Sequence, residues 1–237
     1  MQLIAVVVLL LLQSLVASAQ DRFQSPQGDS IGDESLNRLE ALSHEGVPIL
    51  GQKFWDDDHG AAYQCGGSTG ISWARLGDWT PDVRINTDDG WGGCLQSFAL
   101  LDPSNSLSNL KLTIDFSAAP DSDAGQCGEA GEREIIKTAT QPAWSRPYRI
   151  DTDSRKGGCR WTMSMSGRSD IEVRVKFFPD DQGVGQCGEN QTRGPYTPNR
   201  PEYLIAKAGE PLTLDLDTDG RWGGCVFSLQ LVKTSPN

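Results

Sequence analysis

The sequence predicts an all-β protein made of three tandem, disulfide-stabilised, β-sandwich-like repeats of about 60 residues each. Six cysteines alternate between a Gln-Cys-Gly and a Gly-Gly-Cys context along the 237-residue chain, and each context occurs three times. Apolar and polar residues alternate with the period of two that is typical of half-buried strands. No helical periodicity interrupts these stretches, so the repeats are expected to contain strands alone.

The three repeats share one order of landmarks. Gln-Cys-Gly comes first, an Asx-Thr-Asp triplet follows, and Gly-Gly-Cys comes at the same distance after each triplet. Apolar residues stand four and six positions past the second cysteine of every repeat: Phe98 and Leu100, Met163 and Met165, Leu229 and Leu231. A fixed period with matched residues indicates internal repetition. We therefore expect repeats over 47–103, 109–168 and 171–233.

The strand signals differ in clarity between the repeats. Residues 110–116 and 171–177 alternate regularly, which predicts a half-buried strand at the start of the second and third repeats. In the first repeat Pro48 and Gly51 interrupt the alternation, so this copy is expected either to have diverged or to start with an irregular edge. After each Gly-Gly-Cys, the residues two, four and six positions past the cysteine share one face, which places Trp161 on the core side.

A unit of about 60 residues has a marginal core, and one disulfide within each unit offsets this. Pairing within a unit keeps all three loops local, whereas a shifted set of pairs would have to close Cys65 or Cys94 onto the last unit. Each bridge then contributes about 3–4 kcal/mol in the chain-entropy model. The expected pairs are Cys65–Cys94, Cys127–Cys159 and Cys187–Cys225.

Separate units are favoured because each has its own bridge. The alternative is one closed pseudo-three-fold body such as a β-trefoil or a β-prism.

The N-terminal part differs from the repeats. Leu3–Leu12 is an unbroken apolar run, and Ala17-Ser18-Ala19 fits a cleavage site, so residues 1–19 are expected to be a signal peptide. Residues 20–46 are a polar leader whose one helix candidate lies between Asp33 and Gly46. The apolar run is shorter than the roughly 20 residues that span a bilayer. The predicted localisation is secreted, or periplasmic in a bacterium, with no membrane span in the mature chain.

Charge and motifs limit the function classes. The chain has 21 basic and 32 acidic residues, a net charge of −11, which disfavours nucleic acid as a partner. The motifs of phosphate-binding loops, zinc proteases and serine hydrolases do not occur. No catalytic residue is predicted, and a non-enzymatic role is favoured. A secreted hydrolase that uses a pair of acidic residues is the third alternative.

The Asx-Thr-Asp…Gly-Gly-Cys segment is the candidate site. Tryptophan stands three residues before the cysteine in the first and third repeats, and Lys156 takes that place in the second. An indole can stack on a sugar ring while carboxylates accept hydrogen bonds from its hydroxyl groups. The predicted ligand-binding residues are Trp91, Asp88, Asp89, Trp222 and Asp219. The first hypothesis is therefore a secreted carbohydrate-binding protein whose repeated sites give avidity for an extracellular glycan or polysaccharide.

Other interpretations of the same segments stay open. The Asx and Gly residues can simply close a hairpin turn. Asp215, Asp217 and Asp219 are alternate carboxylates that could hold calcium, the one cofactor considered. The second hypothesis is a module that binds a protein partner or inhibits an enzyme, and the long stretch Gly188–Pro201 would be its protruding loop. This stretch also contains Asn190, in the only N-glycosylation sequon.

Overall fold

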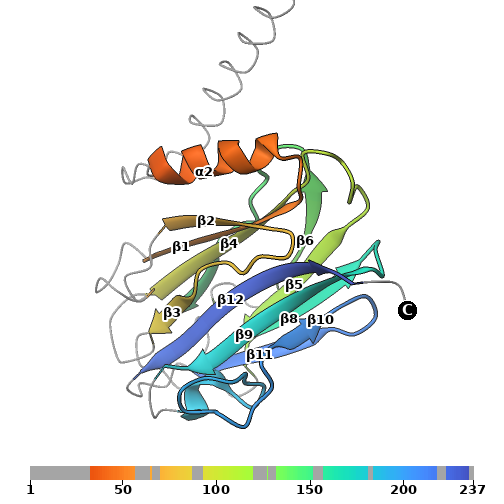
Figure 1. Cartoon of the computed structure of the whole chain (residues 1–237). Coiled ribbons are helices and arrows are strands. Elements are labelled where there is room, and N and C mark those ends of the chain that lie inside the picture. The colour runs from red at the N-terminus through yellow and green to blue at the C-terminus, as the bar shows by residue number, and fades with distance from the viewer. Residues whose placement is uncertain are drawn as a thin grey trace, which may run out of the picture.

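A computed structural model gives the fold (Figure 1) and describes residues 33–56, 65, 70–86, 93–119, 127, 132–151, 157–180, 184–217 and 223–234. The predicted signal peptide lies outside these residues. The described part is mostly β, as expected. Its elements are α2 (Asp33–His44), β1 (Ile49–Asp56), β2 (Gly70–Arg75), β3 (Val83–Asn86), β4 (Gly93–Leu101), β5 (Lys111–Ala118), β6 (Glu132–Ala139), β7 (Tyr148–Asp151), β8 (Gly158–Ser166), β9 (Ile171–Pro179), the 3-10 turn η1 (Val184–Cys187), β10 (Leu204–Ala206), β11 (Leu212–Asp217) and β12 (Gly224–Lys233).

Each stretch predicted as a repeat contains four of these strands, and the first strand is central in every case. The strand β1 pairs antiparallel with β2 and β4, β5 pairs with β6 and β8, and β9 pairs with β10 and β12. The expected strands over 110–116 and 171–177 are confirmed as β5 and β9. No helix among the described residues is long and apolar enough to cross a membrane.

The third strand of each stretch pairs outside its own stretch. The strand β3 lies against β12, β7 lies against β4, and β11 lies against β8, all antiparallel. In register, Asn86 pairs with Gly224, Asp151 with Gly93, and Asp217 with Gly158. This differs from the expectation of separate units, because backbone hydrogen bonds join all three stretches to one another.

The strands form one four-stranded and one eight-stranded sheet. The four-stranded sheet has the order β10-β9-β12-β3, and its strands lie in the lower front of Figure 1. The eight-stranded sheet consists of the groups β2-β1-β4-β7 and β6-β5-β8-β11. Only two parallel residue pairs, Leu100↔Thr138 and Leu101↔Ala139, join the two groups. In effect the described strands form three groups of four.

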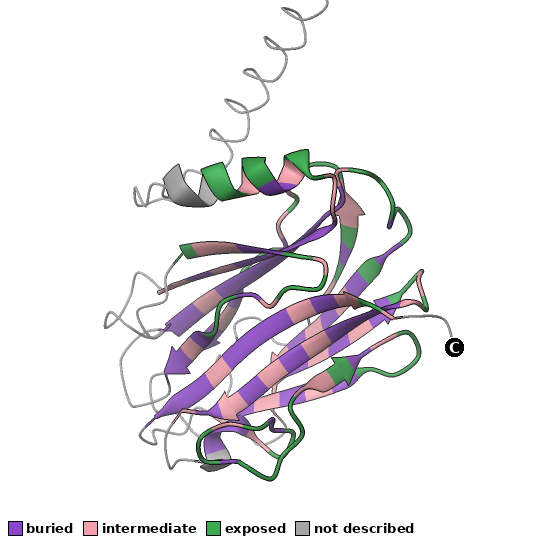
Figure 2. Cartoon of the chain, viewed as in Figure 1, coloured by how far each residue is buried: buried purple, intermediate pink, exposed green. Residues whose placement is uncertain are grey.

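One hydrophobic core contains residues from all three stretches. Its centre is aromatic: the ring of Phe227 lies 6.3–6.4 Å from the rings of Phe54, Phe98, Trp161 and Phe177. Trp161 is fully buried in this cluster, which confirms its predicted position on the core face. Figure 2 shows buried residues along the length of β12, β9 and β8, often alternating with partly exposed ones. A shared core of this kind makes each stretch depend on the other two.

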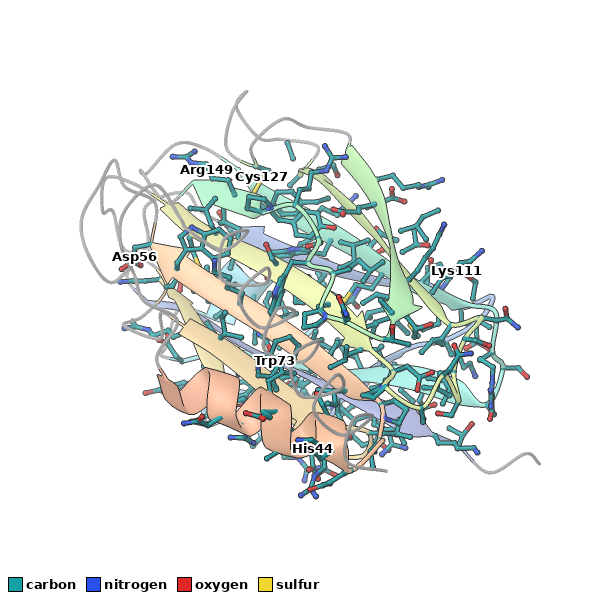
Figure 3. The ribbon with its side chains drawn as sticks, turned by 90° about the horizontal axis from the view of Figure 1, so that it is seen from above. His44, Asp56, Trp73, Lys111, Cys127 and Arg149 are labelled. Carbon is teal, nitrogen blue, oxygen red and sulfur yellow. A yellow bond between two sulfur atoms is a disulfide. The ribbon has the colours of Figure 1, made fainter. Side chains whose placement is uncertain are left out.

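The prediction of an irregular edge at the start of the first repeat is wrong for β1. The strand β1 is regular and central rather than an irregular edge. Gly51 makes this possible, because a Cβ there would overlap the rings of Trp73 and Trp144, which occupy the face beside it. The expected helix is present as α2, and its Leu42 belongs to the same small apolar cluster as Trp73. Figure 3 shows Trp73 beside this helix.

Candidate functional site

All three predicted disulfides are confirmed, and they occupy matched places in the fold. The Cα–Cα distances are 5.1, 5.4 and 5.7 Å for Cys65–Cys94, Cys127–Cys159 and Cys187–Cys225, respectively. The second cysteine of each pair is the second residue of the fourth strand of its stretch. There it pairs with the end of a first strand and the end of an exchanged third strand, as Cys225 does with Pro179 and Ile85. The bridges therefore fix the strand ends from which the candidate turns start.

The Gly-Gly part of the candidate motif has a backbone role. Gly157 and Gly223 have φ values of 107° and 109°, which side-chain-bearing residues rarely adopt. A Cβ on Gly224 would overlap the carbonyl oxygen of Ile85 on β3, and one on Gly158 would overlap the backbone of β11 in the same way. The first glycine therefore serves the turn, and the second allows the exchanged strand to approach closely.

The predicted sugar-contacting residues lie outside the described residues: Trp91, Asp88, Asp89, Trp222 and Asp219. Their anchoring strands are described. Asn86 ends β3 and is the Cα partner of Gly224, which begins β12. The chain thus leaves β3 toward Trp91 at the same place where it enters β12 after Trp222. The sequence alone did not predict that these two segments have adjoining anchor points.

The predicted calcium ligands are only partly described. On β11, Arg160 donates two hydrogen bonds to Asp215, at 2.6 Å to Oδ1 and 3.0 Å to Oδ2. Asp217 is two residues further along the same face of the strand, and Asp219 is outside the described residues. Within the described ranges, no group of three or more His, Cys, Asp or Glu side chains could hold a metal ion. The Arg160 guanidinium already neutralises the Asp215 carboxylate.

The long stretch Gly188–Pro201 is fastened to β9 near its start. The backbone N–H of Thr192 donates to the carbonyl of Phe177 at 2.7 Å, and its buried hydroxyl accepts from the N–H of Phe177 at 3.0 Å. The hydroxyl of Thr197 donates to the carbonyl of Thr192 at 2.7 Å. These bonds hold the loop against β9 at Thr192, while residues 195–196 and 198–201 are exposed. Nearby, the side chain of Asn190 is exposed and donates to the carbonyl of Thr213.

Two cation–aromatic pairs on the outer face of the four-stranded sheet were not predicted from the sequence. The Nζ of Lys176 lies 4.4 Å from the ring centroid of Trp79, and the Cζ of Arg174 lies 4.4 Å from that of Tyr203. The alternation in 171–177 does predict that both cations face away from the core. Their aromatic partners could not be found, because they come from segments without strand periodicity.

Ionisable groups with shifted pKa values have structural partners. Burial and the charge of Glu134 raise the pKa of Tyr148, whose hydroxyl donates to Glu134 Oε2 at 3.3 Å. The hydrogen bond from Arg168 lowers the pKa of Asp170 to about 2, at the turn between β8 and β9. Both shifts favour the state that the group already has near neutral pH. Neither group is therefore poised to exchange a proton there.

Comparisons with known proteins leave the function to be argued from these residues. No family model, curated protein or solved structure matches the chain.

Proposed function

We propose that the protein is a secreted, non-catalytic carbohydrate-binding protein that contacts its ligand through the turns containing Trp91 and Trp222. One observation supports this most directly: Asn86 and Gly224, which anchor these two turns, are paired strand ends. Two indoles and their neighbouring carboxylates would then serve one ligand, stacking on sugar rings and accepting hydrogen bonds from hydroxyl groups. The three disulfides are consistent with an oxidising compartment such as the extracellular space or the periplasm.

The proposal includes the architecture. We infer that the three stretches are copies of one unit that exchange their third strands in a cycle, closing into a pseudo-three-fold body closer to a β-prism than to separate beads. The support is the pairing of β3 with β12, β7 with β4 and β11 with β8, around one shared core. Each group of four strands then contains three strands of one unit and one strand of another.

This arrangement would give the turns a rigid support. In each pair the second cysteine lies within a ladder, and the glycine before Cys159 or Cys225 contacts the backbone of an exchanged strand. A pre-organised site loses less conformational entropy on binding than a flexible one. Sites repeated on one body bind a polymer more tightly than any single site does, through effective concentration.

The test is binding of the mature protein to an array of glycans and insoluble polysaccharides. Trp91→Ala combined with Trp222→Ala is expected to abolish binding while the melting temperature stays unchanged. Lys156→Ala is the matched control, because Lys156 takes the same turn position in the second stretch without an indole. Equal loss in both variants, or no binding by the unaltered protein, would reject the proposal. Parallel arrays with calcium and with a chelator show whether a cation takes part.

A further inference from the structure

The outer face of the four-stranded sheet has two cation–aromatic pairs, Lys176–Trp79 and Arg174–Tyr203, whereas β1 has one, Lys53–Trp55. On the β5–β8 side, the ion pairs Arg133–Asp115 and Arg160–Asp215 lie across the strands. On the β1–β4 side, α2 and two tryptophan rings occupy part of the face. Over β9 and β12 the surface contains aromatic rings and cations side by side. We define the sheet-face platform as Trp79, Arg174, Lys176, Tyr203, Ser228 and Gln230.

Strand alternation places the platform on the outside. On β12, Phe227 and Leu229 belong to the core. Ser228 lies between them and Gln230 follows Leu229, so both face outward. In register, Lys176 is the Cα partner of Ser228 and Arg174 is that of Gln230. The platform is therefore a continuous area across neighbouring strands rather than a set of scattered side chains.

The segment before β3 adds the indole to this face. Trp79 forms an isolated antiparallel bridge with Gln230, and Thr80 exchanges two hydrogen bonds with Leu229, at 2.8 and 2.9 Å. The side chain of Gln230 donates to the carbonyl of Gly77. Figure 1 shows this segment running along β12 between β2 and β3. Because its backbone is held in the ladder, the position of Trp79 is fixed before any ligand arrives.

The contact between Lys176 and Trp79 spans β12 at the level of Ser228. Ser228 is fully buried, and its hydroxyl has no hydrogen-bond partner among the described residues. A buried hydroxyl without a partner is costly unless a bound group supplies one. The lysine side chain is flexible, and its displacement from the indole would open the ring face to a ligand.

The second aromatic ring lies on the other side of β9. Tyr203 directly precedes β10, and its ring contacts Arg174, which Glu172 holds through a 2.7 Å hydrogen bond. From the strand line of Tyr203 to that of Trp79 there are three strand-to-strand steps of about 4.8 Å, a span of about 14 Å. Rings separated in this way, with amide, hydroxyl and cationic donors between them, suit an extended chain of sugar rings.

We propose that the sheet-face platform is a second carbohydrate surface, for an extended polysaccharide chain that lies across β9 and β12. This inference rests on the proposed function but uses none of its turn residues. The rings of Trp79 and Tyr203 stack on separate sugar units, and Gln230, Ser228 and Lys176 bond the hydroxyl or carboxylate groups between them. The turns and the platform then act as two sites on one body.

The experiment is isothermal titration of the full mature protein, disulfides intact, with hexasaccharides of cellulose, chitin and polygalacturonate. Trp79→Ala and Tyr203→Ala are each expected to raise the Kd about three- to tenfold, the range typical of one aromatic contact. The matched control is Tyr196→Ala, because Tyr196 is an exposed aromatic residue of the neighbouring loop outside the platform. Trp79→Phe keeps a ring and is expected to retain most of the affinity.

The turn variant Trp91→Ala with Trp222→Ala separates the two proposals. Under the platform proposal, this variant retains hexasaccharide binding that Trp79→Ala then weakens. If Trp79→Ala and Tyr203→Ala bind like the unaltered protein while the turn variant loses binding, the platform is rejected and the turns stand. If only the platform variants lose binding, the turns are rejected. No binding of any hexasaccharide by the unaltered protein would overturn the platform, while the glycan array tests the turns separately. Salt-sensitive binding of polygalacturonate alone would identify an acidic chain as the ligand.

Discussion

Replacing Gln52 and Gln96 with leucine should make the protein more stable. Both side chains are fully buried, and their four amide atoms have no hydrogen-bond partner among the described residues. Both face the core, because Gln52 is the Cα partner of Phe98 and Gln96 is that of Phe54. The matched core positions are apolar in the other two stretches: Ile114 and Val175 for Gln52, Trp161 and Phe227 for Gln96.

The magnitude follows from the cost of unmet hydrogen bonds. A buried polar group without a partner costs about 1–3 kcal/mol, so two amides cost roughly 2–6 kcal/mol. A volume-conserving replacement within a packed core usually costs less than about 1.5 kcal/mol. Two such replacements together cost less than about 3 kcal/mol. At mid-range values, about 4 kcal/mol gained and about 1.5 kcal/mol lost, we expect Gln52→Leu with Gln96→Leu to raise the free energy of unfolding by about 2–3 kcal/mol.

Urea unfolding followed by far-ultraviolet circular dichroism, with the disulfides oxidised, measures this change. The matched control is Ile114→Gln, which places an amide at the equivalent position of the second stretch and should lower the free energy of unfolding. A double variant that is less stable than the unaltered protein would refute the reasoning. It would show that the two amides have partners, such as internal water, whose bonds outweigh the desolvation of the side chains.

Three further predictions concern single features. Gly224→Ala should destabilise the fold by about 1–3 kcal/mol, because its Cβ overlaps the backbone of β3. Thermal unfolding should show a larger loss than for Gly209→Ala, where the space is open and only the φ of +79° opposes a side chain. The pKa of Asp170 is lowered from 3.8 to about 2 by Arg168, so its stabilisation is present above pH 4 and lost as the pH falls toward 2. Asp170→Asn should therefore lower stability at pH 6 but not at pH 2, and a pH-independent difference in urea titrations would contradict this. Calcium chloride should leave the melting temperature unchanged, because Arg160 already holds Asp215; a rise that a chelator reverses would show that a cation site exists.

Local features of the sequence predicted much of the fold. Matched cysteine contexts gave the disulfide pairs, because pairing within each predicted repeat keeps all three loops local. Alternation gave the strands β5 and β9 and the inward face of Trp161, because side chains alternate between the two faces of a strand. The helix α2 followed from its leucine spacing and from the glycine that ends it.

Pairing between distant strands was not predictable in this way. The four residues of β3, Val83–Asn86, alternate identically whether they pair with β4 or with β12. Alternation tells which face a residue takes but not which ladder a strand joins. The regularity of β1 depends on Trp144, which is remote in sequence and covers Gly51. Likewise, the platform residue Trp79 comes from a segment with no strand periodicity, so nothing local linked it to β9.

The position of β12 between β9 and β3 has a consequence for how the protein is made. Thr80 and Leu229, which bond one another, are 149 residues apart in sequence. During synthesis, β3 and β9 leave the ribosome before the strand that separates them. Until β12 is released, both present unpaired edges, and such edges readily join those of other chains. A chain cut short before Gly224 would lack the strand that joins its beginning to its end, and we expect it to aggregate rather than to fold in part.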